Sequence, residues 1–296
     1  MIKQKVKEFI GFERRIISQL EHAQTKDGSI KAFATAMGDA LTTAETIYLF
    51  KTSNIKSKID IEKAMEWLCK IQSPEGKWTT GSPDAWETST TAWAILALSK
   101  EYSKYKDNIT RAISWLISKQ DIDGGFSQSD FITEPNTYAT AYSGLACHSL
   151  GETFKNNENK ALEWLKKAQN NDGGFGLHIG ENSEASLTAY VCHFLVSLKN
   201  KRALNIYKKA TNWLIRNQRP SGAWTSWFEK SDSIEGTCFT LFVLCLGGLH
   251  LTEEDVFTKG LKFLIKKLNA EEVDNWICVS LLHLMNALRI RFSDIL

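Results

Sequence analysis

One pattern recurs along the chain at an almost constant spacing. Each copy has Lys or Arg, Ala, two residues, Trp-Leu, three residues, Gln, three residues, Gly, one residue, and Trp or Phe. The first full copy, "KAMEWLCKIQSPEGKW", runs from Lys63 to Trp78, and weaker copies lie near both ends. The Gln positions 24, 72, 120, 169 and 218 are 48 or 49 residues apart. Such a period predicts stacked units, each too small to bury its own apolar face.

Each unit holds two helical patterns. The first ends at the Gln and is amphipathic, as in "NKALEWLKKAQ", so we expect it outside with one apolar stripe facing inward. The second is apolar nearly all round, as in "LTAYVCHFLVSL", and is expected to be buried. The pattern predicts one all-α domain over residues 1–296, an α6/α6 barrel (toroid) with six inner helices inside six outer ones. The units are approximately residues 1–52, 53–101, 102–151, 152–200, 201–250 and 251–296.

The repeated Gln and aromatic residues have a structural interpretation. A Gln amide both donates and accepts, so it can bond unpaired backbone groups at its own helix end or at a neighbouring helix. The Gly that follows tolerates left-handed backbone and ends the outer helix. We expect the repeat to hold the helices together rather than to form an active site.

Composition narrows the choice of partners. The net charge is +2 and no run of Lys or Arg forms a block, so no nucleic-acid partner is expected. The longest apolar stretch, "FTLFVLCLGGLHL", is too short to span a bilayer, and the charged N-terminus lacks a signal-type apolar region. We therefore expect a cytoplasmic protein. The six Cys have no close pair spacing, which favours buried free thiols in a reducing compartment.

Most of the expected inner helices begin with an acidic residue four positions before Thr-Ala or its equivalent. In a barrel these side chains would lie at one end, near the opening of the central cavity. Acids at helix starts commonly cap free amides and face the positive end of the helix dipole. The alternative is that one or two of them face the cavity and act as acid or base. The six positions are Asp39, Glu87, Asn136, Glu184, Glu235 (aligned with Phe239-Thr240) and Asp274 (aligned with Cys278-Val279).

The four full copies of the pattern resemble the QW repeat of squalene-hopene and oxidosqualene cyclases. More broadly, the chain resembles the terpenoid cyclase and protein prenyltransferase superfamily of α/α toroids, over nearly its whole length. The resemblance implies the toroid fold and an isoprenoid substrate in the central cavity. It implies less about the reaction, because function depends on the site rather than on the scaffold.

Cyclases of this superfamily that start by protonation carry an Asp-x-Asp-Asp-Thr-Ala motif, whose central Asp protonates an alkene or epoxide. The nearest match here is "PDAWETSTTAW", in which Thr91-Ala92 fits the end of the motif and Ser89 occupies the catalytic position. The motif is therefore absent, and Asp84 and Glu87 are the nearest substitutes for the acid. In the other units the same position is Leu41, Tyr138, Ser186 and Thr237.

The prenyltransferase relatives use zinc, held by an Asp-x-Cys pair and a His on the next inner helix. Glu235 falls at the Asp position, but Thr237 and Ile277 stand where the Cys and His would be. Buried, inert Cys are expected, and an irregular site of Glu235, Cys238 and Cys278 stays an open alternative. No metal or cofactor is predicted, with Mg²⁺ expected only if the substrate is a diphosphate.

Aromatic residues gather near the starts of the inner helices. Their faces can stabilise a carbocation in a cavity that excludes water, and the alternative is ordinary core packing. The candidates for substrate binding are Trp86, Trp93, Tyr138, Tyr142, Tyr190, Phe239 and Trp276.

The first function hypothesis is a terpenoid cyclase-like enzyme, of the isomerase or lyase class, that acts on a small-molecule isoprenoid by acid-initiated carbocation chemistry. The second is a non-catalytic module that binds a lipid, peptide or protein partner at the barrel opening. A glycan-active enzyme with paired carboxylates comes third, and a zinc-dependent prenyltransferase-like protein comes last. For the enzyme, the candidate catalytic residues are Glu87, Asp84, Asp39, Glu184, Glu235 and Asp274.

Overall fold

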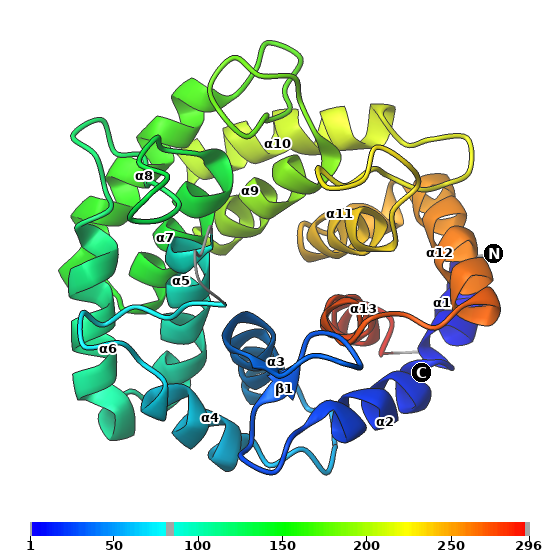
Figure 1. The fold of residues 1–296 in the computed structure, drawn as a ribbon. Helices are drawn as coiled ribbons and strands as arrows, with labels where there is room; N and C mark the ends of the chain where they lie inside the picture. The colour runs from blue at the N-terminus through cyan, green and yellow to red at the C-terminus, as the bar shows by residue number, and fades with distance from the viewer. Residues whose placement is uncertain (1, 81–85, 294–296) are drawn as a thin grey trace.

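The computed structural model describes residues 2–80 and 86–293, and their helices form two concentric rings (Figure 1). Consecutive inner helices pack side by side, and the last packs back against the first, so the inner ring is closed. This is the α6/α6 barrel that the repeat predicts. The inner helices are α3 (Ala40–Thr52), α5 (Glu87–Leu98), α7 (Thr137–Ser149), α9 (Ala185–Ser197), α11 (Ile234–Leu246) and α13 (Asn275–Arg291).

The outer ring contains one helix more than the six predicted, among the residues described. The additional helix is α1, which packs against α12 and brings the two ends of the chain together (Figure 1). Short 3₁₀ turns η1 (Ser99–Glu101), η2 (Glu152–Phe154) and η3 (Leu249–Leu251) lead into outer helices, and strands β1 (Ile30–Lys31) and β2 (Gly38–Asp39) form a small antiparallel hairpin. The outer helices are α1 (Ile2–Ile10), α2 (Glu13–Ala23), α4 (Ile61–Lys70), α6 (Tyr102–Ile117), α8 (Lys155–Ala168), α10 (Lys201–Arg216) and α12 (Glu254–Ala270).

The repeated Gln links each turn to the next outer helix. Gln120 Nε2 donates to the carbonyl of Gly124 at 3.1 Å and to that of Asn157 on α8 at 3.0 Å. Asn157 Nδ2 donates back to Gln120 Oε1 at 2.7 Å. The structural role expected for the Gln is confirmed, although its partners are carbonyls of the turn and of the following helix. The same pair of amide bonds is made by Gln24, Gln72, Gln169 and Gln218.

Both the backbone conformation of each turn and its close contact with the next helix require Gly. Gly124 has a φ of +102°, a conformation that residues with a Cβ rarely adopt. A Cβ built there would also lie 2.4 Å from the carbonyl oxygen of Lys160 on the next outer helix. The turn therefore contacts its neighbour through bare backbone, which explains why the pattern repeats Gly at this position.

Among the residues described, no helix has the length and apolar character that a membrane crossing requires.

Candidate functional site

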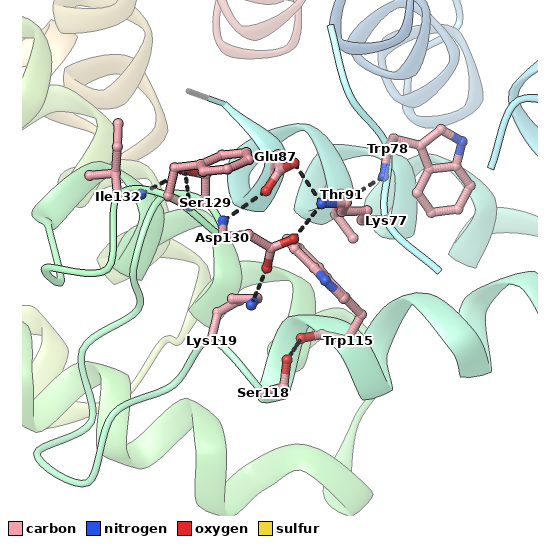
Figure 2. Close-up of polar contacts among 11 residues, drawn as sticks. Lys77, Trp78, Glu87, Thr91, Trp115, Ser118, Lys119, Ser129, Asp130 and Ile132 are labelled. Carbon is pink, nitrogen blue, oxygen red and sulfur yellow. Dashed lines mark hydrogen bonds and ion pairs between the residues drawn. The ribbon is translucent and has the colours of Figure 1, made fainter. Parts of the chain in front are cut away.

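A Thr hydroxyl near the start of each of the first five inner helices sets the register of the repeat. Thr91 Oγ1 accepts a hydrogen bond from the Trp78 N–H at 3.0 Å (Figure 2), and Thr237 Oγ1 accepts one from the Trp224 N–H at 3.1 Å. The alignment of Glu235 with Phe239-Thr240 was therefore wrong by two positions. The other bonds of this kind join Thr43 to Ile30, Thr140 to Phe126 and Thr188 to Phe175.

The corrected register moves Glu235 to a different place in its unit. Ser233, four residues before Thr237, accepts the N–H of Gly236 at 3.2 Å and is the N-cap of α11. Glu235 lies two residues before Thr237. In the cyclases that this chain resembles, that is the position of the central Asp of the catalytic motif.

A cavity of about 840 Å³ opens at the end of the barrel where the inner helices begin. Five of the seven predicted substrate-binding residues line it. Trp86 and Tyr138 meet edge to face with ring centroids 5.8 Å apart, and Tyr190 and Phe239 do so at 4.8 Å. Together with Trp276 they form the aromatic part of the wall, which suits an apolar ligand. The five are Trp86, Tyr138, Tyr190, Phe239 and Trp276.

One ring from every inner helix closes the barrel below this cavity. Neighbouring ring centroids in this aromatic layer lie 5.0–6.3 Å apart, in a closed circuit. The other two predicted substrate-binding residues, Trp93 and Tyr142, belong to it rather than to the cavity wall. The barrel is therefore filled by side chains at this level. The layer consists of Tyr48, Trp93, Tyr142, His193, Phe242 and His283.

Glu235 faces the cavity from the start of α11. Its side chain is buried, with the residue 3% exposed, and none of the described residues forms a hydrogen bond with its carboxyl group. Burial raises the pKa of Glu235 to about 8, because a carboxylate out of water is strongly disfavoured. The group is thus a protonated carboxyl in an aromatic cavity at neutral pH.

Glu45 is a second carboxyl that faces the cavity, and the predicted set of acids does not include it. It is the one acidic residue of α3, it is half-buried, and it lines the same cavity. Burial is the main cause that raises the pKa of Glu45 to about 8, and the nearby carboxyls of Asp39 and Glu235 add to it. The signal in the sequence is an acid directly after Thr43-Ala44, in a stretch with no other charged residue between Asp39 and Lys51, where an acid has no capping role.

Glu87, unlike Glu235, is surrounded by groups that bond its carboxyl. Its Oε1 pairs with Lys77 Nζ at 2.6 Å, and its Oε2 accepts the N–H of Asp130 at 2.8 Å (Figure 2). Asp130 in turn pairs with Lys77 and Lys119, and both ammonium groups lie over the ring of Trp115. Glu87 is 3% exposed, yet it is not among the residues that line the cavity. It belongs to an ion-pair network that joins the start of α5 to the segments before α5 and after α6.

The remaining acids of the predicted set are placed differently from one another. Asp39 caps α3 by accepting the N–H of Thr42 at 2.7 Å, and it also lines the cavity, as does exposed Asp274 at the N-cap of α13. Burial raises the pKa of Glu184 at the N-cap of α9, although Glu184 does not line the cavity. Asp84 lies outside the described residues.

The Cys and His residues do not form a metal site in the part of the chain that the structure describes. No three His, Cys, Asp or Glu side chains there are grouped closely enough to hold a metal ion. Cys238 and Cys278 are buried, and burial raises the pKa of Cys278 to about 12, so its thiol stays protonated. Burial lowers the pKa of His193 to about 4 and that of His283 to about 3, so both imidazoles are neutral at pH 7.

A sequence profile of the prenyltransferase alpha-alpha toroid domain matches residues 4–175 and 135–277. The chain therefore belongs to the prenyltransferase alpha-alpha toroid family. No match was found among curated proteins.

Solved structures share the fold at low sequence identity. A variant of the type II terpene cyclase MstE from Scytonema, in complex with its product merosterolic acid A, has a TM-score of 0.75 at 13% identity over 100% of both chains. A glycosidase variant has a TM-score of 0.73 at 11% identity, over 96% of this chain and 98% of that one. The ent-copalyl diphosphate synthase from Streptomyces platensis has a TM-score of 0.64 at 17% identity, over 84% of this chain and 50% of that one.

Proposed function

We propose that this protein is an enzyme that cyclises an isoprenoid by protonating one of its double bonds inside the cavity. The observation that carries the proposal is Glu235, a buried carboxyl that no described residue hydrogen-bonds, on the wall of a cavity lined in part by aromatic rings. Its raised pKa keeps the proton in place at neutral pH. A proton donor must hold its proton before the substrate arrives, and most carboxyl groups on a protein surface do not.

A carboxyl with a pKa of about 8 is a weak acid, so the cavity has to stabilise what forms when the proton leaves. The products of the step are a carboxylate and a carbocation in contact, in a site with little water to screen them. The faces of Tyr138, Tyr190 and Phe239 offer the cation an attractive quadrupole. The same dryness that raises the pKa thus strengthens the attraction between the two charges.

The reaction balances without a co-reactant. The Glu235 O–H proton adds to one alkene carbon and leaves a tertiary cation at the other. Further double bonds attack that cation and close rings, and the last cation loses a proton from a neighbouring carbon. The product is an isomer of the substrate, and a proton returns to the carboxylate through solvent or a neighbouring group. No cofactor takes part, and Mg²⁺ would accompany only a diphosphate substrate.

Two findings support an isoprenoid as the substrate. Aromatic rings form part of the cavity wall, and a layer of contacting rings fills the barrel below them. MstE, which has the same fold, has also been solved with geranylgeranyl dihydroxybenzoate as substrate.

The paired carboxyls Glu45 and Glu235 also favour a second candidate, a glycosidase, since a glycosidase variant shares the fold. Glycosidases need one protonated and one ionised carboxyl. Here the pKa of both carboxyls is raised to about 8, mainly by burial, so both are mostly protonated at pH 7 and the ionised partner is a minor species. We therefore rank glycan hydrolysis second, and non-catalytic binding of a lipid, peptide or protein partner third.

The test is an incubation of the purified protein with squalene, geranylgeraniol, geranylgeranyl dihydroxybenzoate, and geranylgeranyl diphosphate with and without Mg²⁺. Mass spectrometry would detect cyclised isomers. We expect Glu235→Gln to lower turnover at least about 100-fold and Glu45→Gln to lower it less. Glu158→Gln, which changes a buried Glu bonded to Lys155 on α8, is the matched control and should keep activity. No product with any substrate, or full activity in Glu235→Gln, would refute the proposal.

A further inference from the structure

Acidic side chains dominate the opening of the cavity. Of the described residues that line it, eight are Asp or Glu, and the single basic one, Lys267, is paired with Glu271 at 3.1 Å. Glu45 and Glu235 lie inside and carry protons at neutral pH, since the pKa of each is raised to about 8. The other six lie at or near the opening: Asp39, Glu229, Asp232, Glu271, Glu272 and Asp274.

The structure points to a substrate whose outer end is positively charged: we propose that the ligand is an isoprenoid amine, with its ammonium group at the acidic opening and its apolar chain inside. This rests on the proposed function for the nature of the chain and extends it by assigning the head group. A bare diphosphate would carry negative charges into a region that already holds up to six of them, and like charges at short range repel.

The acidic opening is more than a cluster of surface acids, because a buried group below it lacks a partner. Glu235 is 3% exposed, faces the cavity and forms no hydrogen bond with the described residues. A buried carboxyl without a described partner marks the cavity as a place for a ligand, and the outer end of that ligand would then lie at the acidic opening. Phe228 and Trp86 lie beside the opening with ring centroids 5.7 Å apart, and aromatic faces bind ammonium groups well.

A basic depression on the outer surface offers a competing place for an anionic head group. It is lined by Arg219, Lys262, Lys266 and Lys267, and it adjoins the cavity through Ser231, Asp232 and Lys267. Two of the four cations are already paired, Arg219 with Asp232 at 2.9 Å and Lys267 with Glu271 at 3.1 Å. Apart from the acids of those pairs, Asp39, Glu229, Glu272 and Asp274 line the cavity at or near its opening, which keeps the opening acidic.

The experiment measures binding and not turnover. Isothermal titration calorimetry of the full chain at pH 7 and about 0.1 M salt would compare farnesylamine, farnesol and farnesyl diphosphate, the last with and without Mg²⁺. We expect farnesylamine to bind at least about tenfold more tightly than farnesol and farnesyl diphosphate to bind more weakly than farnesol. Equal affinities for amine and alcohol would overturn the proposal.

A rim variant locates the ammonium group. In Glu271→Gln/Glu272→Gln/Asp274→Asn, the preference for amine over alcohol should fall about fivefold, as the loss of several partly exposed charges predicts, while farnesol affinity stays the same. The matched control is Glu253→Gln/Glu254→Gln/Asp255→Asn, which removes equal charge at the other end of α12 and should bind like the parent. An amine preference that survives in the rim variant would mean that the ammonium lies deeper, which contradicts the proposal.

Two further outcomes keep this proposal separate from the proposed function. If farnesyl diphosphate binds most tightly and Lys262→Met/Lys266→Met weakens it, the head group lies in the basic depression and the amine proposal is wrong. An amine preference in a protein that cyclises nothing supports the acidic opening as a cation site and refutes only the reaction. Cyclisation of squalene without any amine preference supports the proposed reaction and refutes the amine proposal.

Discussion

Glu87 and Glu235 are the same residue type, each 3% exposed and each close to the start of an inner helix. Glu87 is bonded by a Lys ammonium group and a backbone N–H, whereas no described residue bonds to the carboxyl of Glu235. One carboxyl therefore stabilises the fold through its charge, and the other destabilises it if it ionises. Glu87 lies four residues before Thr91 and Glu235 lies two before Thr237, so the comparison shows that two positions near the helix start decide which neighbours an acid has, and that those neighbours decide its chemistry.

The largest expected effect comes from removing the cation beside Glu87. Lys77→Met leaves a buried carboxylate with one backbone N–H as its remaining partner, and such a loss typically costs about 3–5 kcal/mol. Urea unfolding at pH 7 measures the change in the free energy of unfolding. Arg202→Met, which breaks an exposed pair with Glu163, is the control and should have a much smaller effect. Similar effects in both variants would show that the Glu87 network contributes no more than a surface pair.

The second prediction is that removing the carboxyl of Glu235 raises the free energy of unfolding. The folded-state pKa of Glu235, about 8, is higher than the ordinary value of 4.5, so the unfolded chain loses this proton at lower pH than the folded protein does. Stability should then fall as pH rises from about 4.5 to 8. Glu235→Gln has no such proton and should be more stable than the parent by about 4 kcal/mol at pH 8, with little difference at pH 4.

Thermal or urea unfolding at both pH values checks this prediction. Glu87→Gln serves as the counterpart, since replacing a paired carboxylate with an amide should lower stability at pH 8. If both Gln variants are destabilised to the same extent, the two carboxyls are equivalent and the comparison fails. A more stable Glu235→Gln that has also lost turnover would indicate a group kept for activity at a cost in stability.

The barrel could be predicted from sequence because every unit repeats the same local solution. The 48- or 49-residue spacing of Gln24, Gln72 and the later copies reports bonds between neighbouring outer helices, and those bonds recur around the ring. The extra helix α1 could not be predicted, because no second copy of it exists. It packs on α12, some 250 residues away in the chain.

The cavity was only partly predictable, for a physical reason. Aromatic residues near the helix starts do line it. Residues two positions apart on a helix point in nearly opposite directions, so a register error of two residues changes the expected surroundings of a side chain completely. Glu235 was aligned through Phe239-Thr240, and only the bond from Trp224 to Thr237 revealed its true place. Whether an acid has a cation beside it, as Glu87 has Lys77, depends on turns that the repeat does not specify.

The smallest expected effect tests the sign of the pH dependence. Burial acts to raise the pKa of Asp130, but the Lys119 and Lys77 ammonium groups overcome it and hold the pKa below its ordinary value. The stability from Asp130 is therefore present above the unfolded-state pKa and is lost as pH falls through the lowered one. Because the side chain is 38% exposed, solvent screens the pairs, and Asp130→Asn should cost about 0.5 kcal/mol at pH 7 and nothing measurable at pH 2.

Glu235→Gln should differ from the parent most at high pH and with the opposite sign, so unfolding curves of the two variants across pH would diverge. Parallel curves would mean that ion pairing around Asp130 and burial of Glu235 do not distinguish the two regions.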